Sequence, residues 1–183
     1  MKKTFAIAAA LTALASYSHA ADLDAVEARV RDDLKSKIVT DKIIAAIKAQ
    51  NEANASLSEA DVKALDDKWQ GGDQAMIDAK LGSDVSQDLK KMVEGSAGFY
   101  GEIFLMDNKG LNVAQSDKTS DYWQGDEAKW QKTYLKGAGA LFVDDVEFDE
   151  SSQSFTTQVN AAIADPATGE VIGAVTFGVN VEE

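Results

Sequence analysis

Aromatic residues are concentrated between Ser116 and Lys136, a segment that joins two predicted strands and is long for a connection in a compact domain. This segment holds two of the three tryptophans and two of the four tyrosines of the chain. Trp123, Trp130 and Tyr134 are seven and four residues apart, so a helix here would carry all three on one face. That face either packs on the rest of the molecule as core or forms the wall of a pocket.

Acidic side chains accompany these aromatic residues. Ser120 or Asp126 is a candidate N-cap of the short helix, and Asp121, Asp126 and Glu127 would lie at the edge of a pocket. An aromatic face beside a carboxylate attracts an ammonium group through cation–π attraction and charge-assisted hydrogen bonds. A ligand carboxylate would have to use Lys118, Lys129, Lys132 or backbone N–H groups, because both arginines of the chain lie in the predicted first helix. The pattern therefore favours an amine as ligand.

The composition excludes many classes of enzyme. The chain of 183 residues has no cysteine and a single histidine, His19. Thiolate metal sites, disulfides, thiol nucleophiles and histidine-dependent triads are therefore excluded for a chain that loses its first 20 residues. The acidic residues between Asp144 and Glu150 lack the ligand spacing of a calcium loop and are predicted to form a solvated edge. We expect no enzyme, no cofactor and no metal site.

The first 20 residues are predicted to be an export signal that is cleaved after Ala20. A basic start is followed by an alanine-rich apolar stretch and by the small-x-small sequence Ser18-His19-Ala20. The net charge is −13 for the whole chain, and −15 for the remaining 163 residues, because the leader holds two lysines and no acid. Such a charge disfavours nucleic acid and anionic lipid as partners. No later stretch reaches about 18 consecutive apolar residues, so we expect a soluble periplasmic protein with no direct membrane insertion.

Hydrophobic periodicity predicts a helical first half and a strand-rich second half, with the change near Gly95. Apolar residues recur every three or four positions from Asp22 to about Asn54, as one long helix or two helices joined near Thr40. Three shorter helices are predicted over residues 58–70, 73–81 and 83–93. We expect one domain, 21–183, with an N-terminal helix (21–54), a helical segment (55–97) and a sheet (98–183) that contains a pocket insert at 116–137.

Five strands are predicted in the second half, at 101–106, 111–115, 138–146, 154–164 and 170–181. Short connections make the sheet antiparallel, with the helices ahead of it in the chain, which is an α+β fold. In the strand 154–164, one set of alternate residues is apolar and is expected to face the helices. The other set, which includes Gln158 and Asn160, lines a polar cavity or faces water.

Individual residues of this half have predicted structural roles. Asp107 and Asp165 each open a turn, where an aspartate side chain bonds the backbone two residues further on. Gly173 and Gly178 allow close approach of a backbone or ligand, or mark bulges.

The order of these elements resembles the Cache family of extracytoplasmic sensor domains, also called PDC sensors. The most specific motifs are a hydrophobic strand that ends in Asp107-Asn-Lys-Gly110, the following Asn112-Val-Ala-Gln-Ser116, and the closing Asp165-Pro-Ala-Thr-Gly169-Glu-Val-Ile-Gly173. The resemblance covers roughly residues 22–181. It implies a PAS-like five-stranded antiparallel sheet with the long helix behind it, and a small-molecule pocket between the other sheet face and the insert.

The resemblance also implies a set of ligand-binding residues: Tyr122, Trp123, Asp126, Trp130, Tyr134 and Asp165. Asp165 matches the position of an aspartate that meets the ligand amine in amino-acid-binding members of the family. The insert lacks the arginine that holds the ligand carboxylate in those members, which favours an amine or another cationic or zwitterionic metabolite.

Three functions follow from the sequence. The first is a free-standing periplasmic sensor module that binds a small molecule and signals through a membrane-bound receptor or kinase. The second is an interaction or scaffold protein without a functional pocket, whose N-terminal helix pairs with another protein or with a second copy as a homodimer. The third, ranked last, is a carboxylate-dependent hydrolase.

Overall fold

The computed structural model describes residues 22–149 and 153–181, so the predicted export signal and its cleavage site lie outside the described residues. The α-helices are α1 (Leu23–Asp33), α2 (Asp41–Ala53), α3 (Glu59–Gln70), α4 (Gln74–Leu81), α5 (Asp84–Glu94) and α6 (Ala128–Gln131). A π-helical segment, η1 (Leu34–Ile38), continues α1, and a 3-10 turn, η2 (Tyr134–Lys136), follows α6. The strands are β1 (Tyr100–Met106), β2 (Asn112–Gln115), β3 (Leu141–Val143), β4 (Glu147–Asp149), β5 (Ser154–Ala164) and β6 (Val171–Val181).

The predicted N-terminal helix is two helices, joined near Thr40. Val39 leaves the helical conformation, with φ −78° and ψ 68°, and Thr40 then caps α2 by accepting a hydrogen bond from the backbone N–H of Ile43. The start of α3 also follows the sequence signal. Ser58 and Asp61 form a capping box, in which each side chain accepts a hydrogen bond from the backbone N–H of the other.

The strands form one antiparallel sheet in the order β2-β1-β6-β5-β3, with β4 also paired to β5, so the predicted α+β class is confirmed. Within the described residues the sheet has six strands, one more than predicted. The predicted strand 138–146 contains only β3, and β4 follows as a separate strand. Val143 pairs with Val159, and Glu147 pairs with Thr156. Three residues separate the two pairs on the outer side and only two separate them on β5, so the outer side carries one extra residue. This bulge divides the edge of the sheet into two short strands.

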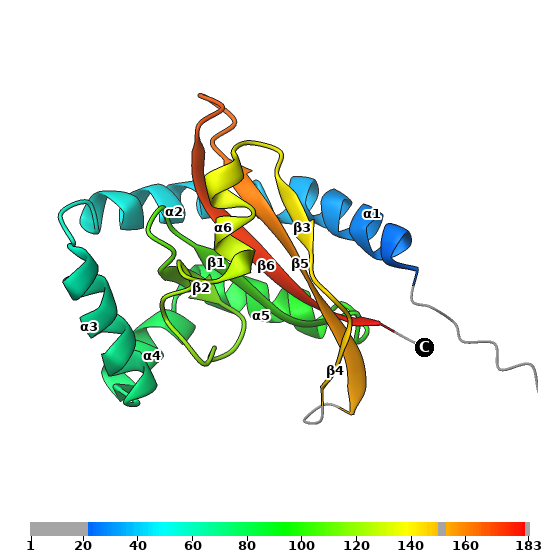
Figure 1. Cartoon of the computed structure of the whole chain (residues 1–183), viewed down its shortest axis with the longest axis horizontal. Helices are drawn as coiled ribbons and strands as arrows, with labels where there is room; N and C mark the ends of the chain where they lie inside the picture. The colour runs from blue at the N-terminus through cyan, green and yellow to red at the C-terminus, as the bar shows by residue number, and fades with distance from the viewer. Residues whose placement is uncertain (1–21, 150–152, 182–183) are drawn as a thin grey trace, which may run out of the picture.

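The two faces of the sheet are covered differently (Figure 1). Helices α1, α2 and α5 lie behind it, where the apolar set of β5 meets them, as predicted: Val159, Ala161 and Ile163 share a core with residues such as Ile47. Helix α6 crosses the front face. The apolar stripe of the N-terminal helices is therefore buried against the sheet of the same chain.

Two predicted local features are confirmed. Asp107 and Asp165 open their turns as Asx caps, accepting hydrogen bonds from the backbone N–H groups of Lys109 at 2.8 Å and Ala167 at 2.9 Å. Gly173 permits close approach, because a Cβ atom there would lie 2.2 Å from the carbonyl oxygen of Met106.

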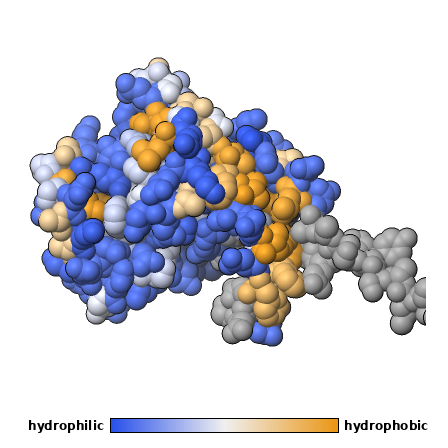
Figure 2. Space-filling view, viewed as in Figure 1, coloured by the Kyte–Doolittle hydropathy of each residue, from blue (hydrophilic) through white to orange (hydrophobic). Residues whose placement is uncertain are grey.

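The surface is mainly hydrophilic over α2 to α4, and hydrophobic residues gather near β4 and β5 (Figure 2). Val146 and Phe148, beside and within β4, are 37% and 49% exposed. Within residues 22–149 and 153–181, no helix combines the length and the apolar character needed to cross a bilayer.

Candidate functional site

The insert between β2 and β3 is not one helix, so the prediction that Trp123 shares a helical face with Trp130 and Tyr134 was wrong. Residue 123 lies before α6, in an isolated β-bridge with Leu111. The backbone N–H groups of residues 122 and 123 both donate to Oδ1 of Asp66, at 2.8 and 3.0 Å, which holds this part of the insert extended.

The start of α6 also differs from the prediction. The N-cap residue is Glu127, without a side-chain cap, so neither Ser120 nor Asp126 caps the helix. The Ser120 hydroxyl donates to the Asp121 carboxylate instead, at 2.6 Å.

Trp130 and Tyr134 cover the front of the sheet. Their rings stack with centroids 4.8 Å apart, and both pack against Phe104, Met106 and Ala174. The indole N–H of Trp130 donates to the carbonyl oxygen of Asp107 at 3.1 Å. These contacts make the two rings part of a small core, which was the first of the two interpretations of the aromatic face. Burial raises the pKa of Tyr134, with a further increase from the nearby carboxylate of Asp107.

Tyr122 and Trp123 belong to a separate cluster with α3 and α4. Tyr122 is 4% exposed and stacks on Trp69 at 5.5 Å between ring centroids. Burial among these groups raises the pKa of Tyr122 far above its usual range. The indole N–H of Trp123 donates to the carbonyl oxygen of Lys109 at 2.9 Å. Trp123 also borders a surface hollow of about 360 Å³ with Val62 of α3.

The two acids of the predicted set lie elsewhere. Asp126 is exposed. Asp165 is buried at the β5–β6 turn, where its carboxylate accepts a hydrogen bond from the ammonium of Lys48 on α2 at 2.8 Å. That bond and the backbone N–H of Ala167 hold the pKa of Asp165 below its usual value. The structure thus brings Trp130 and Tyr134 together, while Tyr122 and Trp123 belong to the cluster with α3 and α4, and Asp165 pairs with Lys48.

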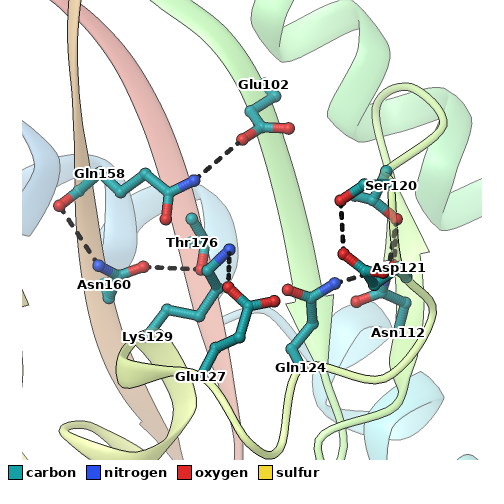
Figure 3. A network of polar contacts seen from close by, with 11 residues as sticks. Glu102, Asn112, Ser120, Asp121, Gln124, Glu127, Lys129, Gln158, Asn160 and Thr176 are labelled. Carbon is teal, nitrogen blue, oxygen red and sulfur yellow. Dashed lines mark hydrogen bonds and ion pairs between the residues drawn. The ribbon is translucent and has the colours of Figure 1, made fainter. Parts of the chain in front are cut away.

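A polar row crosses the front of the sheet beneath the insert. Cross-strand partners share a face, and the pairings place five residues in this row: Gln115, Phe104, Thr176, Asn160 and Phe142. The Thr176 hydroxyl donates to Asn160 Oδ1 at 2.7 Å, and both residues are fully buried. In the next row, the amide of Gln158 donates to Glu102 at 3.4 Å (Figure 3). The alternating pattern of the β5 sequence had pointed to this polar face.

A hollow of about 300 Å³ opens at this end of the sheet, between α6 and strands β4 and β5. Four acidic residues line it: Glu127, Asp144, Asp145 and Glu147. Gln158 also contributes to its wall. Among the described lining residues Lys129 is the only basic one. Its ammonium lies 3.0 Å from Glu127 Oε2 (Figure 3) and 5.5 Å from the centre of the Phe104 ring.

The sequence predicted a solvated acidic edge here, and Asp145 and Glu147 are indeed exposed, with Asp144 half-buried. It did not predict that these acids line a hollow. The bulge between β3 and β4 brings them opposite α6. The arrangement suits a cation, since carboxylates outnumber the single ammonium and amide groups supply hydrogen bonds beside them. In the described part of the chain, no group of three or more histidine, cysteine, aspartate or glutamate residues is arranged to hold a metal ion.

No protein-family model matches the sequence, and comparison with curated proteins finds no match. Among solved structures, the ligand-binding domain of the Campylobacter jejuni chemoreceptor Tlp3, in complex with 4-methylisoleucine, is 16% identical, with a TM-score of 0.38 over 86% of this chain and 55% of that one. The ligand-binding domain of the Pseudomonas aeruginosa amino acid chemoreceptor PctC, in complex with GABA, is 12% identical, with a TM-score of 0.41 over 63% and 55%. The extracellular domain of the histidine kinase rpHK1S-Z16 is 14% identical, with a TM-score of 0.43 over 88% and 59%.

These structures are sensor domains of the kind that the sequence motifs resemble. The chain spans little more than half the length of each of them. Likeness of this degree does not transfer the ligands of those receptors to this chain.

Proposed function

We propose that the protein is a periplasmic sensor module that binds a small amine, or another cationic or zwitterionic metabolite, in the acidic hollow between α6 and β5. The single observation that carries this proposal is the lining of the hollow, with four carboxylates against one lysine. The volume of about 300 Å³ is at the small end of the range for ligand pockets, which suits a metabolite of few atoms.

The charge of the hollow decides between ligand classes. Near a protein surface, two unit charges 4 Å apart interact by about 4 kcal/mol at an effective dielectric constant of 20. A cation is attracted by each of the four carboxylates, and an anion is repelled by each of them. Because the hollow is open to solvent, the attraction is screened by salt, and amine affinity should fall as ionic strength rises.

The signalling role rests on the resemblance to Cache sensor domains together with this site. In this proposal a membrane-bound receptor or kinase reads the ligand-bound state of the module. The scaffold alternative has less support, because the apolar residues of α1, η1 and α2 that would form a dimer face already pack on the sheet, as Val30 and Ile38 do.

The test is a melting-temperature screen with putrescine, cadaverine, ethanolamine and choline, on protein unfolded and refolded to remove any ligand carried from the cell. A bound amine raises the melting temperature by an amount that grows with its concentration. We expect D144N to abolish this rise. D126N is the matched control, because Asp126 is an acid of the same insert that lies outside the hollow and should keep the response.

Two results would contradict the proposal. One is a wild-type protein whose melting temperature none of the four amines raises. The other is a response that D126N abolishes and D144N keeps, which would place the amine at the acid named by the sequence instead of in the hollow.

A further inference from the structure

Lys129 places a primary ammonium inside the acidic hollow. The side chain starts from α6 and is 14% exposed. Its ammonium lies 3.0 Å from Glu127 Oε2 and 5.5 Å from the centre of the Phe104 ring. A carboxylate together with an aromatic face is the pair of groups that recognises an ammonium in a binding site. The chain therefore supplies its own example of the cation that this position accepts.

We infer that Lys129 occupies the ammonium subsite of the hollow, and that the ligand is a primary amine which displaces this side chain. The inference rests on the proposed function of the hollow. Binding then replaces the ion pair between Lys129 and Glu127 by one between Glu127 and the ligand.

Truncation of Lys129 tests the subsite directly. K129A removes Cγ, Cδ, Cε and Nζ, the atoms of n-propylamine, so that amine should bind the variant and restore the missing contacts. We expect n-propylamine to raise the melting temperature of K129A and to bind it at least tenfold more tightly than wild type by calorimetry. 1-Propanol, which has nearly the same shape without the charge, should have no such effect.

K132A is the matched control, because Lys132 also leaves the α6 region and lies over an aromatic ring, with its ammonium 3.8 Å from the centre of Phe142, but is exposed. K132A should respond to n-propylamine as wild type does. Should K129A not fold, K129M keeps the apolar stem and vacates only the ammonium position, and the ammonium ion is then the probe.

The outcomes separate this inference from the proposed function. A gain in amine binding confined to the Lys129 variants supports the subsite. Equal binding by wild type, K129A and K132A overturns the subsite and leaves the amine-binding function standing. A gain in the variants, with a wild-type protein that binds none of the amines in the screen, supports the subsite and overturns the sensor function, because Lys129 would then fill the hollow permanently. No binding by any of the proteins overturns both.

Discussion

Replacing Gln115 with methionine measures the cost of burying an amide without hydrogen-bond partners on β2. Gln115 is 1% exposed with both amide atoms unpaired in the described residues. Such a group costs about 1–3 kcal/mol when it is buried. Methionine has a similar length and no polar group to satisfy, so Q115M should stabilise the ligand-free protein by about 1–3 kcal/mol. For a domain of this size, that corresponds to a rise in melting temperature of about 2–4 °C per kcal/mol.

Gln124 provides the matched control. It is 2% exposed, and its side-chain amide donates to the carbonyl oxygen of Asp121 at 2.8 Å. Q124M removes this bond, and the Asp121 carbonyl oxygen still accepts a hydrogen bond from the Thr119 hydroxyl at 2.7 Å, so the variant should destabilise the protein by about 1 kcal/mol. Urea unfolding followed by tryptophan fluorescence gives both free energies. The reasoning is refuted when Q115M destabilises the protein as Q124M does, because an ordered water would then already bond the Gln115 amide.

Three further predictions concern the framework around the site. Burial lowers the pKa of Lys80 to about 8, despite the nearby carboxylate of Asp107. Between pH 8 and 10.5 the Lys80 amine is protonated in the unfolded state and mostly neutral in the folded state. The free energy of unfolding should therefore rise with pH over this range, by at most about 3 kcal/mol. K80M should remove this rise between pH 8 and 10 in urea unfolding, and the exposed K90M should retain it. G173A should destabilise the protein by about 1–3 kcal/mol or more, because its Cβ would lie 2.2 Å from the backbone oxygen of Met106. G101A is its control, with the nearest atom 3.6 Å away in a side chain, and equal unfolding free energies for the two variants would contradict the packing argument. The lowered pKa of Asp165 stabilises the folded state above pH 3.8, and this stabilisation is lost as the pH falls through the folded-state value. D165N should therefore flatten the acid limb of a series of thermal melts between pH 2 and 6, and an unchanged acid limb would show that the Lys48 contact contributes nothing.

Much of the framework could be predicted because its signals are local. The capping box of Ser58 and Asp61 spans four residues, and the turn of Asp107 depends on atoms two to four residues away. The alternation of β5 follows from the pleat of a single strand. Each of these signals is contained in a short stretch of sequence, and the structure agrees with all of them.

The arrangement of the insert could not be predicted in the same way, because distant residues determine it. Asp66 of α3 holds residue 122 in an extended conformation from 56 residues earlier in the chain. Asp165 meets Lys48 across 117 residues, on the side of the sheet opposite the insert. The bulge between β3 and β4 depends on their register with β5, and it turns the acids from Asp144 to Glu147 toward α6. Spacing within the insert contains none of this information.

A crystal structure of the protein, saturated with the amine that binds most tightly in the screen, tests the central claim most directly. We predict density for the amine between α6 and β5, with its ammonium within hydrogen-bond distance of the carboxylate of Glu127 and the Lys129 side chain displaced toward solvent. Density for the amine at any other place, with Lys129 still paired to Glu127, would contradict the account.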